Sequence, residues 1–476
     1  MKITMSNFLT ERKLLLRQII EKLGPYFPYV SILGTNSKGK QYLVQKSGIA
    51  VSDSRWAERG FVVRVYNGKN YSEVSFNELP IEISTEFIRD LCAQVQEPLT
   101  RLRSGPVKLT TYPLIQEEKI RESLLGQVAI HPQMVTTEQK LQKMSAIKEM
   151  ALKQSPLLVD FKVRFEEVQV SKLFISGPKE LEQSYIWSQG YLMATVRKEK
   201  QTKYAYKAFS GLKGVELLDE MAGEYEKVIA QAQRLLEAKA VEPGEYDVIC
   251  SPEIAGLIAH EAFGHGVEMD MFVKNRAKAL EYLGKPVASE KVTMHDGADA
   301  AHNVSSYLFD DEGVIATDTV VIDHGILKTG ISDRLSALKL GTEPTGNGKR
   351  ESFERKAYAR MTNTFFAGGR DRLEEMIASI QHGYLLDGTM SGMEDPKNWG
   401  IQCMIMQGEE IKEGKLTGAI ISPVIMTGYV PDVLKAVTMV TAEVNLFGSG
   451  ACGKGHKEWV KVSDGGPYIK TRVRLG

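Results

Sequence analysis

SPEIAGLIAHEAFGHGVEMD, residues 251–270, places two histidines and an adjoining acid inside an otherwise apolar segment. Ser251 can accept an amide hydrogen bond from a first helical turn, Pro252 fits that turn, and the acid after it complements the helix dipole. The sequence therefore predicts a helix that begins at Pro252 and carries both histidines.

The two histidines and the acid indicate metal chemistry. His260 and His265 can ligate zinc through neutral imidazoles, and Glu261 can accept a proton from water, as in helical zinc peptidases. An offset of five residues places the two rings about 140° apart on a regular α-helix, too far for one ion. A π-bulge or a helix break would absorb the extra residue, and Gly264 and Gly266 lower its cost. We expect irregular geometry between His260 and His265.

A catalytic zinc site usually has three protein ligands and one open position, so a third ligand is required. Cys452 lies in the glycine-dense GSGACGKG, residues 448–455, where the backbone can bring a thiolate close to another element. The residues alone leave the third ligand open among Cys452, Glu268, Asp270, Cys250 and His456.

Outward from this stretch, the patterns predict an α+β protein. The N-terminal region reads as α/β-type and is followed by a β-rich C-terminal domain that carries the metal-binding helix. We expect helices at 6–23, 117–153 and 215–240, strands within 27–76, 158–171 and 183–197, a strand directly before Ser251, and hairpins at His324-Gly325 and Glu413-Gly414. The predicted regions are 1–115 (N-terminal α+β), 116–242 (middle strands and helix) and 243–476 (C-terminal metalloprotease).

Composition narrows the functional class. The 476 residues include 60 basic and 60 acidic side chains, so no net field attracts nucleic acid or an anionic membrane. The four cysteines include no C-x-x-C pair, which favours a reducing, cytoplasmic location. Neither a signal-peptide core nor a membrane-spanning run is evident.

Four further motifs are weaker. GTNSKGK at 34–40 lacks the Ser or Thr of a phosphate loop and reads as a hairpin, and the G-x-G-x-x-G at 448–453 lacks its helix. Residues 310–312, Asp-Asp-Glu, are expected to form a solvated acidic turn rather than a cation site. The motif with Arg350, Arg355 and Arg360 reads equally well as a clamp for carboxylate or peptide carbonyls and as an exposed basic segment.

The chain resembles the TldD/PmbA family of metalloproteases, whose members are often labelled modulators of DNA gyrase. The resemblance is strong from about 245 to 476 and looser before that. The TldD branch is distinguished by H-E-x-x-x-H, which this chain contains and the PmbA (TldE) branch lacks. The resemblance rests on HEAFGHGVEMD, FDDEGV, GNGKRESFERKAYARMTNTF, LLDGTMSG and GACGKG, in that order.

This resemblance implies a Zn²⁺ peptidase acting on unfolded polypeptides or peptides. It assigns His260, His265 and Cys452 as zinc ligands and Glu261 as general base. It also implies a dimer, either a homodimer or a heterodimer with a PmbA/TldE-like subunit, with no direct contact to nucleic acid or membrane. The alternative is a non-catalytic binding or regulatory protein whose metal is structural or absent.

Overall fold

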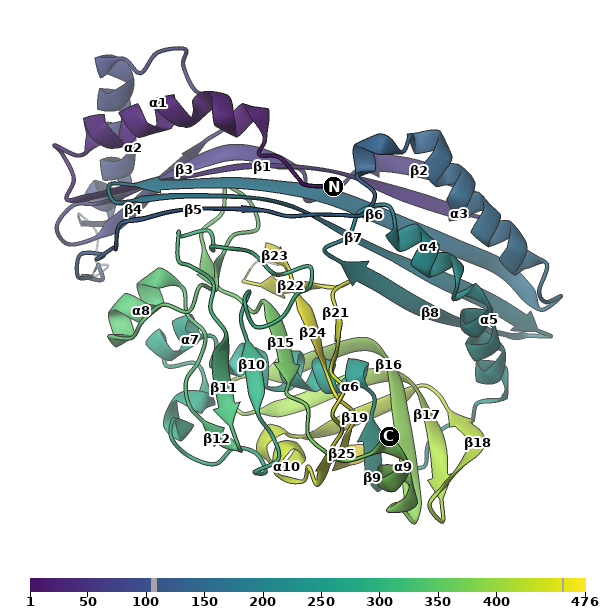
Figure 1. The fold of residues 1–476 in the computed structure, drawn as a ribbon. Coiled ribbons are helices and arrows are strands. Elements are labelled where there is room, and N and C mark those ends of the chain that lie inside the picture. Colours follow the sequence, from purple (N-terminus) through teal and green to yellow (C-terminus); the bar gives the residue numbers. More distant parts are fainter. Residues whose placement is uncertain (104–108, 456–457) are drawn as a thin grey trace.

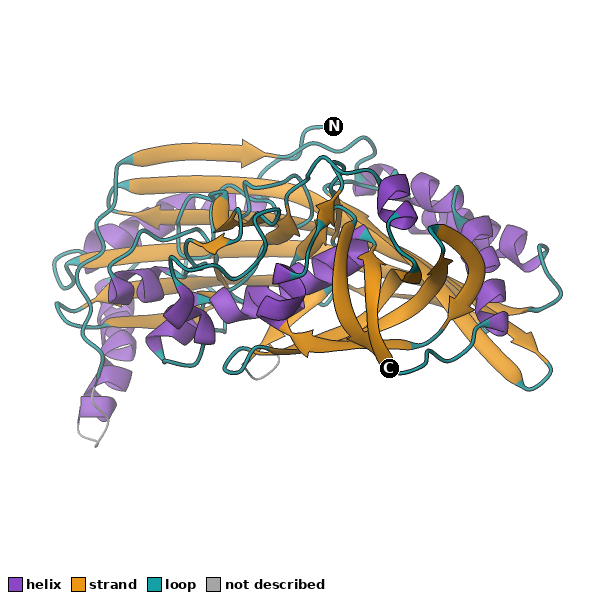
Figure 2. Ribbon diagram, turned by 90° about the horizontal axis from the view of Figure 1, so that it is seen from below, coloured by secondary structure: helices purple, strands orange, loops and turns teal. Residues whose placement is uncertain are grey.

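The computed structural model describes residues 1–103, 109–455 and 458–476. It has the predicted α+β architecture: a long N-terminal sheet with helices packed on it lies across a β-rich C-terminal half (Figure 1). Figure 2, seen from the side of the C-terminal half, shows the long strands of that sheet behind the shorter, strongly curved C-terminal strands. None of the described helices is long and apolar enough to cross a membrane.

The N-terminal sheet has eight strands in the order β4-β3-β1-β6-β7-β5, with β2 paired to β1 and β8 paired to β7. The segment 34–40 lies within β1, so it forms no phosphate loop, although it is one long strand rather than the expected hairpin. The strands are β1 (Tyr29–Gln45), β2 (Gly48–Asp53), β3 (Glu58–Tyr66), β4 (Tyr71–Phe76), β5 (Ile120–Leu125), β6 (Leu158–Ser176), β7 (Lys179–Lys198) and β8 (Gln201–Gly211).

Both faces of this sheet are apolar, because successive side chains of a strand point to opposite faces. Ile32 and Ile175 pack under the first two helices, whereas their neighbours Leu33 and Phe174 pack with Phe309 of the C-terminal half. The helices of this region are α1 (Asn7–Leu23), α2 (Thr85–Arg103), α3 (Thr137–Leu152), α4 (Leu217–Ala222) and α5 (Tyr225–Arg234).

The structure corrects two predicted helices. Of the expected helix at 117–153, only α3 forms, and β5 instead pairs in parallel with β7. The expected helix at 215–240 is divided into α4 and α5 near Gly223. The patterns did not predict α2, which contains an internal proline, Pro98. Strands from 1–115 and from 116–242 share one sheet. The domain boundary that we place near residue 115 therefore stays a prediction.

The C-terminal half contains two main sheets. One has six strands in the order β12-β11-β10-β15-β24-β21, and the other follows β16-β9-β25-β19-β17-β18, with β20 paired to β25. Both predicted hairpins are confirmed, with left-handed backbone at His324-Gly325 and at Glu413-Gly414. The strands of the two sheets are β9 (Gly244–Cys250), β10 (Met294–Asp296), β11 (Thr319–Asp323), β12 (Ile326–Leu327), β15 (Asn363–Phe366), β16 (His382–Asp395), β17 (Gly400–Lys412), β18 (Lys415–Ile421), β19 (Val424–Tyr429), β20 (Met439–Val440), β21 (Asn445–Phe447), β24 (Ser463–Gly466) and β25 (Ile469–Leu475).

Two small strand pairs and short helices complete this half. The pairs are β13 (Gly348–Lys349) with β14 (Tyr358–Ala359) and β22 (Ala451–Lys454) with β23 (Glu458–Lys461). The α-helices are α6 (Pro252–Leu257), α7 (Met269–Val273), α8 (Arg334–Leu340), α9 (Leu373–Ala378) and α10 (Val430–Lys435).

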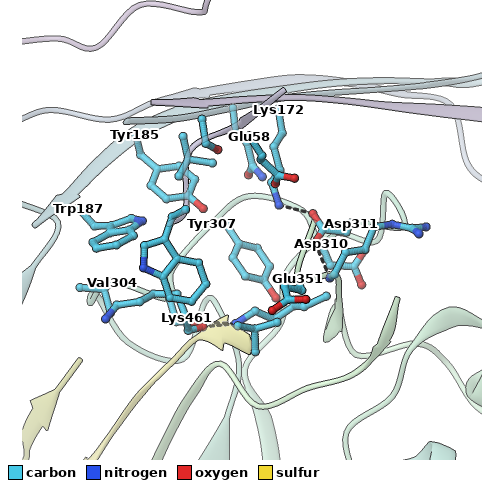
Figure 3. Close-up of a pocket in the computed structure, with 18 of the residues that line it drawn as sticks. Glu58, Lys172, Tyr185, Trp187, Val304, Tyr307, Asp310, Asp311, Glu351 and Lys461 are labelled. Atoms are coloured by element: carbon cyan, nitrogen blue, oxygen red, sulfur yellow. Dashed lines mark hydrogen bonds and ion pairs between the residues drawn. The ribbon is translucent and has the colours of Figure 1, made fainter. Parts of the chain in front are cut away.

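The expected solvated acidic turn at 310–312 is wrong, because these residues lie buried between the two halves. Asp311 pairs with Lys172 of β6, and Glu312 pairs with Arg64 of β3 (the first pair is drawn in Figure 3). Asp310 accepts backbone N–H bonds, including one of 2.8 Å from Gly348. Charged partners and amide donors supply what water would otherwise supply, so the acids can be buried.

Candidate metal centre

The two histidines lie on a helix that changes its winding at the predicted place. Helix α6 passes into a π-helical segment, Ile258–Gly264, and the backbone N–H of His265 bonds to the carbonyl of His260. This bond spans five residues and places the two rings on one face. Their centroids are 5.3 Å apart and their planes are perpendicular. The expected departure from α geometry is confirmed.

Gly264 and Gly266 serve packing rather than backbone freedom. Gly264 has ordinary right-handed helical dihedrals, with φ −59° and ψ −46°. A β-carbon added at Gly264 would lie 2.1 Å from the Met361 sulfur, and one at Gly266 would lie 2.7 Å from an oxygen of Glu394. Contrary to our expectation, the glycines therefore do not relieve backbone irregularity. They allow neighbouring side chains to approach the helix closely.

Cys452 reaches the histidines from the β22–β23 hairpin, which lies at the top of the C-terminal half, directly beneath the N-terminal sheet (Figure 1). Its sulfur is 3.5 Å from Nε2 of His265. Ligand atoms of His260, His265 and Cys452 all lie within 4.8 Å of one another. Two imidazoles and a thiolate are ligands typical of zinc, so the chemistry of these donors fits such an ion.

Arg360 holds this hairpin in place. Its side chain is 1% exposed and donates to the carbonyls of Cys452, at 2.6 Å, and Glu458, at 3.0 Å. Arg350 instead forms a two-bond pair with the carboxylate of Glu73, at 2.6 and 2.9 Å. Of the three arginines, only Arg355 is exposed. The other two bind a carboxylate or peptide carbonyls, as one of the two interpretations predicted, but these groups belong to the protein itself.

The other candidate ligands lie outside the three-residue cluster. A carboxylate oxygen of Glu268 is 3.3 Å from Nδ1 of His265, on the ring atom opposite the Cys452 contact. Lys454 lies 3.0 Å from Glu268 and 2.6 Å from Asp270. Cys250 is buried at the end of β9, where burial raises its pKa to about 12, and His456 lies outside the described residues.

Electrostatics favour the thiolate form of Cys452. Burial alone would raise its pKa, but His265 and His260 hold the pKa well below the usual range. Burial likewise opposes protonation of His265, yet Cys452 and Glu268 raise its pKa. Although burial disfavours its charge, Glu268 has a pKa of about 2 because Lys454 and His265 are close. The cluster thus holds the sulfur in the state that binds metal.

Glu261 faces the cluster without belonging to it. Its carboxylate lies 3.8 Å from Nε2 of His265, and its side chain is 26% exposed. Gly392 of β16 packs directly on it, since an added β-carbon there would lie 2.8 Å from Glu261 Cγ. The carboxylate is therefore positioned beside the cluster and open to solvent.

Two acids near the cluster were not found from the sequence. Asp464 on β24 has an oxygen 3.9 Å from Nδ1 of His260, which leaves Nε2 of that ring for an ion. Glu394 at the end of β16 has both carboxylate oxygens buried without a partner among the described residues. Both acids are far from the histidines in the sequence, and no motif connects them. Only the folding of the chain brings β24 and β16 to the site.

Comparison with known proteins finds similarity to metallopeptidases. Residues 243–473 match the model of the PmbA/TldA metallopeptidase C-terminal domain. A metalloprotease from Methanocaldococcus jannaschii is 37% identical over 51% of this chain and 52% of its own length. A metalloprotease from Methanothermobacter thermautotrophicus is 30% identical over 66% of this chain and 69% of its own length. The chain thus spans only about half of the first relative and about two thirds of the second.

The fold agreement extends further along the chain. The crystal structure of TldE from Thermococcus kodakarensis superposes with a TM-score of 0.73 over 97% of this chain and 99% of that one, at 18% identity. The fold similarity therefore includes the N-terminal sheet, which lies outside the 243–473 match. From the domain match, the relatives and the shared fold, we conclude that the chain belongs to the TldD/PmbA family.

Proposed function

We propose that the protein is a zinc-dependent metallopeptidase of the HExxxH type that hydrolyses peptide bonds in unfolded proteins or peptides. The observation that carries this proposal is the convergence of His260, His265 and Cys452 within 4.8 Å, with Glu261 beside them. Membership of a metallopeptidase family implies a metal ion, and the mixed nitrogen and sulfur donors favour zinc over hard cations.

His260, His265 and Cys452 would hold the zinc ion, and three protein ligands are typical of a catalytic zinc site. A zinc ion bound there would supply a Lewis acid and an activated water. Glu261 accepts a proton at its carboxylate as the scissile carbonyl is attacked, and then delivers it to the departing amine. Glu268 orients His265 by accepting from Nδ1, so that Nε2 faces Cys452.

The partner follows from the family resemblance, and the location follows from the cysteine pattern. We infer a cytoplasmic enzyme that works as a homodimer or with a TldE-like subunit. The four cysteines are unpaired, in keeping with a reducing compartment. Size measurement of the purified chain, alone and mixed with a TldE-like subunit, decides between the two assemblies.

Glu261 separates the peptidase from a binding protein with a structural metal, because a structural site needs no base beside its ligands. The experiment is metal analysis of the purified protein and cleavage of an unfolded polypeptide, with and without a chelator. Glu261→Gln should keep zinc and lower turnover by about 10² to 10⁴-fold. The matched control is Glu149→Gln, at an exposed glutamate on α3 of the N-terminal region. Near-wild-type turnover in Glu261→Gln at equal zinc content would favour the binding protein.

A further inference from the structure

A pocket lies at the beginning of α6, the helix that leads to His260. Its volume is about 550 Å³. Helix α5 and strand β8 of the N-terminal region form one wall, and β16, β17 and β21 of the C-terminal half form the other. The pocket is therefore built only when both halves are in place, and it belongs to a different set of residues from the metal cluster.

Two buried oxygens on its wall have no hydrogen-bond partner among the residues that the structure describes. The hydroxyl of Ser251, 3% exposed, does not cap α6 as its sequence position predicted. The amide oxygen of Gln407, 8% exposed, also has no donor within the described residues. A buried acceptor without a donor costs about 1–3 kcal/mol, so both oxygens point to a donor supplied from outside the chain.

Two carboxylates line the same pocket. No ion pair connects Glu253 or Asp387 to a basic side chain in the parts of the chain that the structure describes. The basic residues at the rim form their ion pairs elsewhere: Lys207 and Lys227 each contact Glu224, at 2.7 and 2.9 Å, and Arg234 contacts Glu409 at 2.7 Å. Burial, together with Asp387, raises the pKa of Glu253 to about 7, although a backbone N–H of Thr389 and the charge of Lys207 oppose the rise. A cation between the two acids would relieve both the burial cost and their mutual repulsion.

We propose that this pocket binds a positively charged group of the polypeptide substrate, an ammonium or guanidinium. Such a group brings several N–H donors and a positive charge. These match two carboxylates that form no ion pair, and two buried oxygens that accept no hydrogen bond, within the described part of the chain. This inference rests on the proposed peptidase function and adds to it a preference for basic peptides.

The pocket lies within reach of a peptide held at the metal cluster. His260 follows Glu253 by seven positions, which is about 10 Å along a helix. An extended peptide advances about 3.3 Å per residue, so the charged group belongs about three residues from the scissile bond. Strand β16 connects the two places directly, because Asp387 lines the pocket and Gly392 packs on Glu261.

The test uses unstructured peptides that differ only in charge. One carries lysine at single positions up to four residues on either side of the cleavage site, and its pair carries the neutral isostere norleucine. Each pair is made with a free and with an acetylated N-terminus. For the zinc-loaded protein with any partner subunit, kcat/KM should be at least tenfold higher for lysine than for norleucine at one fixed position. A preference for the free N-terminus without a lysine effect would assign the pocket to the α-ammonium instead of a side chain.

The variants Glu253→Gln and Asp387→Asn should lower the lysine-to-norleucine ratio toward one. Glu226→Gln, an exposed glutamate on α5 outside the pocket, is the matched control and should keep the ratio. Tm and zinc content verify that each variant is folded. An unchanged ratio in both pocket variants, or no dependence on either charged group in the parent, would overturn the proposal.

Binding separates failure of this proposal from failure of the peptidase. Fluorescence anisotropy with Glu261→Gln protein measures affinity without hydrolysis, and lysine peptides should bind at least tenfold more tightly than norleucine peptides. If no peptide is cleaved by the parent but this difference persists and is lost in Glu253→Gln, the peptidase function fails and the pocket stands. Equal affinities would overturn the pocket.

Discussion

Two polar clusters differ in how their side chains find partners within the protein. In the interface cluster, Asp310, Asp311 and Glu312, every carboxylate oxygen has a donor from a basic side chain or a backbone amide. In the metal cluster, ligand atoms of His260, His265 and Cys452 instead face one another within 4.8 Å. A complete set of donors is typical of structural burial, whereas two imidazoles and a thiolate that converge on one point are typical of a metal site. Variants of the two clusters should therefore have separable effects.

The largest effect is expected at Cys452, the proposed third ligand. Cys452→Ser replaces a soft thiolate by a hydroxyl, which is a poor zinc donor, so zinc affinity should fall by more than about 100-fold and hydrolysis should be lost. Competition with a chromogenic chelator measures the affinity. Parent-like affinity and turnover would remove Cys452 from the ligand set.

The interface cluster should show the opposite behaviour. Glu312→Ala leaves Arg64 without one of its two carboxylate partners at a buried position, and removing one member of such a pair costs about 3–5 kcal/mol. Urea unfolding monitored by fluorescence measures the loss. Zinc stoichiometry of the folded fraction should stay that of the parent, and a change confined to zinc content would contradict the comparison.

A smaller effect is expected at Glu268, which contacts the proposed ligand His265. Glu268→Gln removes the charge that faces Nδ1 of His265, and such outer contacts are worth about 10- to 100-fold in metal affinity. Stability of the metal-free protein should also lose part of its acid dependence. A carboxyl whose pKa is lowered to about 2 stabilises the fold above its unfolded pKa of about 4.3 and loses that contribution as the pH falls through 2. Identical metal affinity in the two proteins would rule out this role.

The smallest effect concerns Glu58, which lines the cavity between the halves near Lys172 (Figure 3). Burial raises its pKa to about 7, so the folded protein holds a proton that the unfolded chain releases near pH 4. Stability from this group is lost as the pH rises toward 7. Glu58→Gln should therefore stabilise the protein by about 1 kcal/mol at pH 8 and by less at pH 5. Thermal melts at both pH values check the sign, and equal shifts would contradict it.

Local patterns predicted local structure well. The five-residue histidine spacing required a winding change, and the left-handed turns at His324-Gly325 and Glu413-Gly414 fixed two hairpins. Features that depend on distant partners were missed. The acids at 310–312 resemble a surface turn until Arg64 and Lys172, more than a hundred positions away, are brought to them. Asp464 approaches His260 only through β24, and the parallel pairing of β5 leaves no local signal.

The separation of the cluster along the chain sets a time order during synthesis. His265 precedes Cys452 by 187 positions. At about 5–20 residues per second, translation of that interval takes about 10 to 40 s. Throughout it the nascent chain carries both histidines and Glu261 without the thiolate. Until Cys452 is synthesised, the proposed peptidase lacks its third ligand and should be inactive. Its own unfolded segments, which resemble its proposed substrates, are still being made during this interval.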